Sequence, residues 1–309
     1  MAETEPPSLF LSPDNASGPN AARGVLVSAL SARGSADRLR QLAASGVLTA
    51  LIPEIETLKG VVQPKEHFWD VYGHSLETVA AVEFVVDKVC LDWPEANLGS
   101  YLSACAESEI SRLIGLKLAG LLHDVAKPQT KFIEPQGKMH FFGHAALGAA
   151  IACSALSRLG FSLIVQGMVS LMIEHHLRPG FLTTRPDSPS DRSIYRFFRD
   201  TAGVGIETLL LNLADHKAMR GPLLLPSEWQ EHLDRTRDIM RRYHRGQLAK
   251  KPSKLIDGLE LMAKLGLTPC PLVGKLLLAI EMAQDSGEVS SKEEAIAVAE
   301  RLLAGEDFR

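Results

Sequence analysis

Histidine and aspartate residues stand at three places where the surrounding sequence is strongly apolar. His74 lies in WDVYGHSLETV, His123 and Asp124 close the run GLKLAGLLHD, and Asp215 lies within LLLNLADHKA. A carboxylate among leucines is costly unless it is paired or binds a metal ion. Imidazole and carboxylate groups from separate helices form a mixed nitrogen and oxygen site, which suits a divalent ion that activates water. The order of these residues therefore predicts a hydrolytic metal centre.

Three further histidines extend apolar stripes. His144 begins HAALGAAIACSAL, where small residues would let the helix approach its neighbours closely, and His175 and His176 follow FSLIVQGMVSLMIE. These imidazoles could hold a second ion near the first, and two ions favour phosphoester chemistry because they stabilise the attacking and leaving oxygens together. A single histidine on an apolar face is more often a hydrogen-bonded core residue, and Asp215 alone could be a salt-bridge partner. The prediction therefore depends on the combination.

The other histidines carry weaker signals. His67 and His140 fall near loops and are expected to face solvent. His216 follows Asp215 and is rotated by about 100° on the helix, so it should point elsewhere. His232 belongs to a charged helix and needs no functional role.

The spacing of apolar residues indicates helices. From residue 25 onward they recur mostly every three to four positions, without a convincing run of strict alternation, so the sequence predicts an essentially all-α protein. Helices are expected over residues 36–45, 68–91, 100–125, 143–159, 162–177, 190–202, 205–220 and 227–245. A polar, turn-rich loop is expected over residues 126–141.

Composition shifts divide the chain into five expected parts. The start is acidic and rich in Pro, Ser and Asn, without a basic region before an apolar core, which is typical of disorder rather than of a signal peptide. The parts are a disordered leader (1–24), an N-terminal helical segment packing on the core (25–66), a helical bundle with the candidate ligands (67–225), a basic linker helix (226–254) and a small C-terminal helical domain (255–309).

The charge of the chain excludes a general nucleic-acid binder. The 309 residues are 46% hydrophobic and 23% charged, with a formal net charge of −4. Residues 235–254 nevertheless carry eight lysines and arginines against one acid, Asp238. This stretch is either a solvated helix face or a local RNA-binding segment, in which Arg241, Arg242 and Lys251 would contact the RNA backbone.

Cysteine and apolar patterns indicate a compartment. The four cysteines occur singly, which is typical of the reducing cytoplasm. No apolar run reaches the roughly 18 residues that cross a bilayer, so no membrane partner is expected.

The order His74, His123–Asp124, Asp215 resembles the H…HD…D pattern of the HD-domain metal-dependent phosphohydrolases. The wider sequence, including HFWDVYGHSLETV, LAGLLHDVAKPQTKF, EHHLRP and LADHKA, resembles the HD region, body and tail of bacterial tRNA nucleotidyltransferases and poly(A) polymerases over roughly residues 35–300. Those polymerases also carry a nucleotidyltransferase head with an Asp-x-Asp pair on a β-sheet. The 34 residues before the first match are too few for that head, so nucleotide addition by this chain alone is not expected.

The resemblance implies an all-α HD-domain bundle, followed by a small C-terminal helical domain, and roles for individual residues. The first metal would be held by His74, His123, Asp124 and Asp215. The second would be held by His144, His175 and His176. The metal would be one or two divalent ions of Mn, Fe, Ni, Co, Mg or Zn.

The resemblance also implies residues that meet the substrate. Asp124 and Lys127 would be catalytic, with Lys127 contacting a substrate phosphate or bound water. Asp70 would be an extra acidic ligand or would accept a hydrogen bond from an imidazole. Arg178 could clamp a phosphate bidentately or could simply face water at a helix end. Ala145 departs from the family pattern, in which many relatives carry Glu.

Three functions stay open from the sequence. The leading one is a metal-dependent phosphohydrolase acting on a nucleotide or RNA-end phosphoester by metal-activated water. The alternative is a non-catalytic RNA-binding module, with tRNA as its partner, that acts with a separate nucleotidyltransferase head. A third is a regulatory sensor that binds nucleotides without turnover. The oligomeric state does not follow from the sequence.

Overall fold

The computed structural model describes residues 18–107, 109–183, 189–245, 255–268, 270–286, 289 and 291–303. Within these residues the protein is built from helices, and its strands form only two short antiparallel pairs, β1–β2 and β3–β4. The prediction of an all-α fold is confirmed. None of the described helices is both long enough and apolar enough to cross a membrane.

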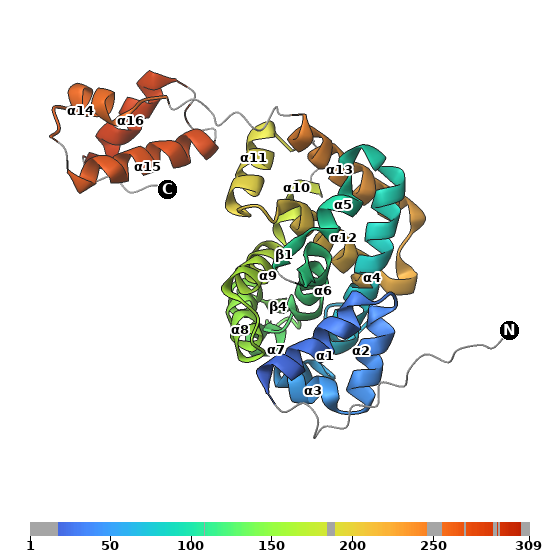
Figure 1. Cartoon of the computed structure of the whole chain (residues 1–309). Helices are drawn as coiled ribbons and strands as arrows, with labels where there is room; N and C mark the ends of the chain where they lie inside the picture. Colours follow the sequence, from blue (N-terminus) through green and yellow to red (C-terminus); the bar gives the residue numbers. More distant parts are fainter. Residues whose placement is uncertain are drawn as a thin grey trace. The chain divides into compact units, whose positions relative to one another are not determined.

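The helices and strands follow one another along the chain as shown in Figure 1. The α-helices are α1 (Pro19–Ser31), α2 (Ser35–Ala44), α3 (Val47–Leu51), α4 (Val71–Asp92), α5 (Leu98–Ser103), α6 (Arg112–Leu122), α7 (Lys127–Thr130), α8 (His144–Arg158), α9 (Leu163–His175), α10 (Arg178–Thr183), α11 (Asp191–Asp200), α12 (Gly205–Arg220), α13 (Pro226–His244), α14 (Gly258–Leu265), α15 (Pro271–Ser286) and α16 (Lys292–Leu303). Short 3₁₀ helices are η2 (Pro53–Leu58), η3 (Pro94–Ala96) and η4 (Gly221–Leu223). The strands are β1 (Cys105–Glu107), β2 (Ile110–Ser111), β3 (Lys131–Ile133) and β4 (Met139–Phe141).

The chain forms two compact units. The first contains residues 1–189 and 197–241, and the second contains residues 190–196 and 242–309. In the first, α4 packs against α6 and α12, and α8 packs against α9. Helix α6 is buried on all sides from Ile114 to Leu122, which explains why its sequence is apolar throughout.

Side-chain caps fix where the central helices begin. Asp70 accepts a hydrogen bond from the Gly73 backbone N–H and starts α4. Ser111 and Ser162 do the same for α6 and α9. Gly143 precedes α8 with a φ of 76°, a left-handed conformation that favours glycine and lets the chain turn from β4 into His144.

Two segments differ from the expected elements. The single helix expected over 100–125 is instead α5, the β1–β2 pair and α6, because Ser111 starts a new helix with an extended backbone at its cap. The loop expected over 126–141 contains α7 and the β3–β4 hairpin, whose register pairs Lys131 with Phe141 and Ile133 with Met139.

The boundaries between the five expected parts of the chain differ from those of the structure. Helix α1 begins at Pro19, earlier than the predicted leader end at residue 24. The linker helix expected over 226–254 is α13, which buries Leu233, Ile239 and Met240 and belongs to the first unit up to Arg241. The second unit has its own apolar core on α14, α15 and α16, with Leu261, Leu276 and Val298 among its buried residues.

One buried ion pair joins the N-terminal helices to the central ones. The Lys117 ammonium on α6 is 3% exposed and lies 2.7 Å from the Glu83 carboxylate on α4, and it also donates to the carbonyl of Leu30. Glu83 accepts further hydrogen bonds from the backbone of Gly34 and Ser35, which start α2. Glu83 therefore stabilises both Lys117 and the beginning of α2.

We expect this pair to weaken in acid. Partial burial opposes ionisation of Glu83, but the hydrogen bonds from Lys117, Ser35 and Gly34 lower its pKa to about 2. Because the folded pKa lies below the ordinary 4.5, the contribution is complete above that value and is lost as the pH falls toward 2. The unfolding free energy of wild type should therefore exceed that of Glu83→Gln at neutral pH and converge with it in acid. A difference that stays constant in urea denaturation across this range would contradict the assignment.

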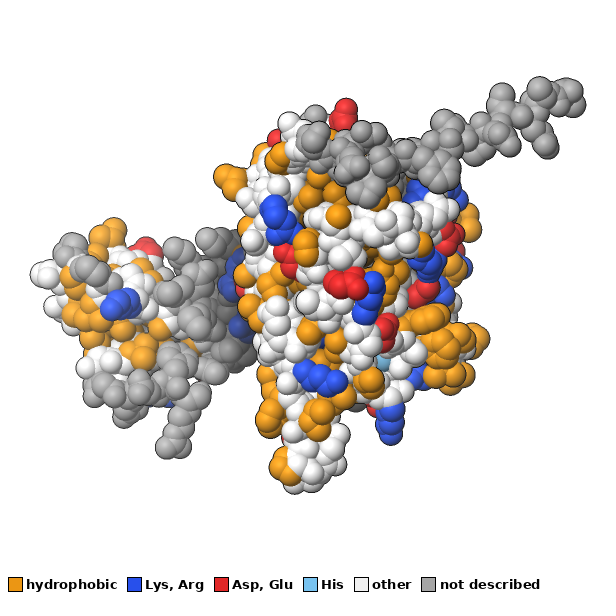
Figure 2. Space-filling model, turned by 90° about the horizontal axis from the view of Figure 1, so that it is seen from below, with side chains coloured by type: hydrophobic (Ala, Val, Ile, Leu, Met, Phe, Trp, Pro, Cys, Tyr) orange, Lys and Arg blue, Asp and Glu red, His pale blue; other side chains and the backbone are white. Residues whose placement is uncertain are grey.

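Charges are mixed on the surface. Figure 2 shows side chains of both signs scattered over one face rather than gathered into a single basic field. The four cysteines are all free thiols, and Cys105 and Cys270 are exposed.

Candidate metal centre

The candidate ligands come from the ends and middles of five helices. His74 lies in α4, His123 caps the C-terminus of α6 and is followed by Asp124, His144 begins α8, and His176 caps the C-terminus of α9. Asp215 lies in α12. The packing of α4 against α6 and α12, and of α8 against α9, brings these separate positions together.

A first group forms around His74 and His123. Their Nε2 atoms lie 3.1 Å apart. The Asp124 Oδ2 atom is 3.4 Å from His74 Nε2 and 3.2 Å from His123 Nε2. Asp215 Oδ1 lies 3.0 Å from His74 Nε2 and 3.7 Å from His123 Nε2. His74 and His123 are fully buried, whereas the Asp215 side chain is 18% exposed.

A second group shares Asp124. His144 Nε2 lies 3.5 Å from Asp124 Oδ1 and 3.4 Å from His176 Nε2. Donor atoms of His74, His123 and Asp124 lie close enough to surround one ion, and so do those of Asp124, His144 and His176. One carboxylate oxygen of Asp124 thus faces each group, so Asp124 would be a ligand in either.

Backbone carbonyls determine which nitrogen each imidazole turns inward. The Nδ1 atoms of His123, His144 and His176 lie 2.9, 2.7 and 2.6 Å from the carbonyl oxygens of Gly120, Phe141 and Ile173. A carbonyl only accepts hydrogen bonds, so each Nδ1 carries the proton and donates it. The Nε2 lone pairs of neutral His144 and His176 then face each other, which is unfavourable unless a cation binds there.

The side chains of the site carry charges of both signs. Burial opposes the charged form of His123, but the carboxylates of Asp124 and Asp215 raise its pKa to about 10. Burial likewise opposes ionisation of Asp124 and Asp215, but the neighbouring histidines hold the pKa of both carboxyls well below their ordinary range. Burial lowers the pKa of His144, and lowers that of His176 to about 4. The site therefore pairs two carboxylates with a protonated His123, beside the neutral imidazoles of His144 and His176, and a bound divalent ion would take the place of the His123 proton.

Asp124 supplies a direct test of whether a metal fits. Both of its carboxylate oxygens are buried and accept no well-aligned hydrogen bond, although the Lys127 ammonium lies 2.7 Å from Oδ2. A buried carboxylate of this kind is costly without a partner of high charge density. The residues present fit one or two divalent ions.

Lys127 lies beside the cluster rather than in solvent. It is 6% exposed and follows Asp124 by one helical turn. Its ammonium also donates to Gln63 Oε1 at 2.6 Å and lies 5.3 Å from the centre of the Phe141 ring. Gln63 was not singled out from the sequence, because nothing in the loop before α4 signals that it folds back to Lys127.

Three sequence-based candidates lie elsewhere. Among the described residues, His175 belongs to neither ligand group, and its neighbour His176 takes the inward position. Among the described residues Asp70 belongs to neither ligand group, and its two oxygens accept hydrogen bonds from the backbone of Gly73 and Gly60. Arg178 forms an ion pair with Asp200 at 2.9 Å.

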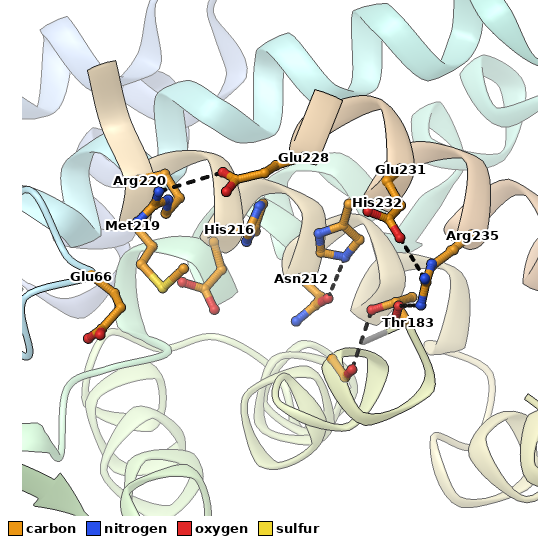
Figure 3. Close-up of a pocket in the computed structure, with 12 residues that line it drawn as sticks. Glu66, Thr183, Asn212, His216, Met219, Arg220, Glu228, Glu231, His232 and Arg235 are labelled. Carbon is orange, nitrogen blue, oxygen red and sulfur yellow. Dashed lines mark hydrogen bonds and ion pairs between the residues drawn. The ribbon is translucent and has the colours of Figure 1, made fainter. Parts of the chain in front are cut away.

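Two histidines with weaker sequence signals lie near the candidate ligands. His67, expected to face solvent, is only partly exposed: its ring centre lies 5.8 Å from that of His74, its Nδ1 is buried without a partner, and burial lowers its pKa to about 4. His232 lines a cavity together with His216 and Asp215 (Figure 3). No sequence pattern predicts this cavity, because it depends on how α13 packs beside α12.

The basic segment is described only in part. Arg241 is exposed, Arg242 pairs with Asp191, and Lys251 lies outside the described residues. The expected RNA contact therefore stays a prediction.

A family model described as HD domain matches residues 100–219. The chain carries an HD domain. The match spans His123, Asp124, His144, His176 and Asp215, whereas His74 joins the site from helix α4 before it. The assignment to HD-domain proteins from the order of histidines and aspartates is confirmed.

This chain is homologous to tRNA nucleotidyltransferases over most of its length. It is 32% identical to a CC-adding tRNA nucleotidyltransferase of Thermus thermophilus, over 83% of this chain and 50% of that protein. It is 28% identical to an A-adding tRNA nucleotidyltransferase of Deinococcus radiodurans, over 92% of this chain and 55% of that protein. It is also 26% identical to a bifunctional uridylyltransferase/uridylyl-removing enzyme of Ruegeria pomeroyi, over 57% of this chain and 18% of that protein. The chain spans about half the length of the two tRNA nucleotidyltransferases.

Proposed function

We propose that this HD protein is a metal-dependent phosphohydrolase that acts on a nucleotide or RNA-end phosphoester. The observation that carries the proposal is the sharing of buried Asp124 between two imidazole groups whose Nε2 lone pairs turn inward. The uridylyl-removing relative supports it, because its name describes removal of a nucleotidyl group. The proposal assigns hydrolysis rather than nucleotide addition to these residues.

The first ion would be held by His74, His123, Asp124 and Asp215, and the second by Asp124, His144 and His176. A bound divalent ion supplies Lewis acidity, which makes water nucleophilic near neutral pH and stabilises charge on a phosphoryl group. Such nitrogen and oxygen ligands suit several first-row ions, so Mn, Fe, Ni, Co, Mg and Zn all stay candidates. Asp124, which faces both groups, keeps them close together.

Other side chains would position the substrate phosphate. The Lys127 ammonium lies at the edge of the cluster, where it would neutralise phosphoryl charge while Gln63 holds its direction. Arg178 could add a bidentate contact to phosphate oxygens only if its ion pair with Asp200 opened. We therefore expect Lys127 to contribute more than Arg178.

A substrate panel tests this function. Protein stripped of metal and reloaded separately with each candidate ion should hydrolyse at least one of 2′,3′-cyclic nucleotides, nucleoside monophosphates or 3′-phosphorylated RNA. Lys127→Ala should lower kcat by about a hundredfold with the fold retained. Absence of hydrolysis with every ion, in protein shown to contain metal, would overturn the proposal.

The second candidate function is a tRNA-binding module that works with a separate nucleotidyltransferase head. It is favoured by the homology to tRNA nucleotidyltransferases over most of this chain. It predicts tRNA binding that weakens steeply with salt, because neutralising phosphates releases counterions. Such binding should survive Asp124→Ala and weaken in Arg241→Gln and Lys251→Gln. Salt-independent binding, or none, would exclude it.

A further inference from the structure

A cavity of about 490 Å³ adjoins the candidate metal centre at Asp215. Helix α12 lines it with Asn212, Asp215, His216 and Met219, whose spacing of three and four residues places them on adjoining parts of one helix face. Figure 3 shows His216 and His232 between the ion pairs Arg220–Glu228 and Arg235–Glu231. Asp215 contacts His74 and His123 and also lines the cavity, so a ligand there can reach the metal centre.

The wall of the cavity is held in place by hydrogen bonds to the metal site. The Asn212 amide donates to the backbone carbonyl of His176 at 3.1 Å, and its Oδ1 lies 3.1 Å from His232 Nε2. The rings of His216 and His232 meet edge to face at 4.8 Å. His216 Nε2 is buried and has no hydrogen-bond partner. The cavity is therefore lined by a pair of imidazole rings in edge-to-face contact, with His232 held by Asn212.

The charges of the lining disfavour a strongly anionic ligand. Four carboxylates line it, those of Glu66, Asp215, Glu228 and Glu231, against two arginines. Arg235 pairs with Glu231 at 2.5 Å, and Arg220 lies 3.6 Å from Glu228. Additional phosphates inside the cavity would meet these carboxylates, whereas an uncharged ring system with polar edges would not.

We propose that this cavity binds the nucleoside of a substrate that carries a single phosphate, with that phosphate directed to the metal centre at Asp215. The proposal rests on the proposed hydrolase function and narrows its substrate to nucleoside monophosphates, either free or at the end of an RNA. A cavity of about 490 Å³ accommodates one nucleoside.

A cavity-filling variant tests the proposal against a substrate without a base. In Met219→Trp the indole should occupy the cavity and lower kcat/KM for AMP, CMP, GMP or UMP relative to that for p-nitrophenyl phosphate by at least about tenfold. Leu91→Trp is the control, because Leu91 is 77% exposed on α4 and its change should leave the ratio as in wild type. An unchanged ratio in folded Met219→Trp would overturn the proposal.

Nucleoside binding separates this proposal from the hydrolase function. Equilibrium dialysis of wild type with the four ribonucleosides, which lack a phosphate, should show saturable binding of at least one of them. Nucleoside binding without hydrolysis of any substrate would support the proposed nucleoside site and contradict the proposed hydrolase function. Hydrolysis of p-nitrophenyl phosphate without nucleoside binding would overturn the proposed nucleoside site and leave the proposed hydrolase function standing.

The nucleoside monophosphate could be a free nucleotide or the end of an RNA, and the same assay compares the two. Turnover of a free monophosphate or of a hexaribonucleotide with a terminal phosphate supports the proposal, and the larger kcat/KM identifies the source. ATP turned over as efficiently as AMP would overturn the assignment of a single phosphate.

Discussion

Asp124→Ala should abolish phosphoester hydrolysis, with kcat/KM falling by at least about a thousandfold. Its two carboxylate oxygens face different imidazole groups, so its loss removes a ligand from both ions at once. We expect the purified variant to retain less than about a tenth of the wild-type metal content, because each group loses its shared anionic ligand. Elemental analysis and the substrate panel measure both effects on the same sample.

Controls separate this effect from loss of folding. Asp87→Ala removes an exposed carboxylate that pairs with Arg33 on the surface, and it should retain wild-type metal content and turnover. His176→Ala should weaken only the second ion, because His176 lies in the group with His144. Turnover by a folded Asp124→Ala protein equal to that of wild type would show that the reaction occurs elsewhere.

Glu83→Ala should destabilise the protein by about 3 kcal/mol, because it leaves the buried Lys117 ammonium without its carboxylate. It also removes the acceptor for the first N–H groups of α2. Chemical denaturation of wild type and variant at neutral pH measures the difference. The substitution should weaken the packing of α2, α4 and α6 against one another around Lys117 and should leave the candidate metal ligands in place.

A matched pair of comparisons checks the cause. Asp87→Ala breaks an exposed ion pair and should cost less than about 0.5 kcal/mol. The double variant Glu83→Leu/Lys117→Met removes both charges together and should regain most of the lost stability, since no buried charge is left alone. Equal destabilisation by Glu83→Ala and by the double variant would mean that packing or the lost acceptor for α2, and not the unpaired Lys117 charge, is responsible.

Helices were predicted correctly from the sequence where their apolar residues recur without interruption. Helix α12 spans the residues expected for it, 205–220, and the expected helix at 143–159 is α8. The prediction was wrong at 100–125, where β1 and β2 interrupt the helix. Apolar spacing alone did not reveal the interruption, because Leu102, Ile110 and Ile114 are all buried in spite of it.

The candidate metal centre was predictable only as a set of residue types. The order of His74, His123–Asp124 and Asp215 indicated the cluster, because buried acids and imidazoles on apolar helices need a partner. The choice of His176 over His175 depends on the C-terminal cap of α9, which turns one ring inward. Contacts made by loops and by neighbouring helices, such as Gln63 with Lys127, leave no periodic signal in the sequence.

The proposal that this cluster binds two divalent ions through Asp124 can be tested by metal titration. Calorimetric titration of metal-stripped wild type with Mn²⁺ should show two equivalents bound per chain. The same titration of His176→Ala should show one tight equivalent, and Asp124→Ala should show neither. Wild type that binds no more Mn²⁺ than Asp124→Ala would contradict the account.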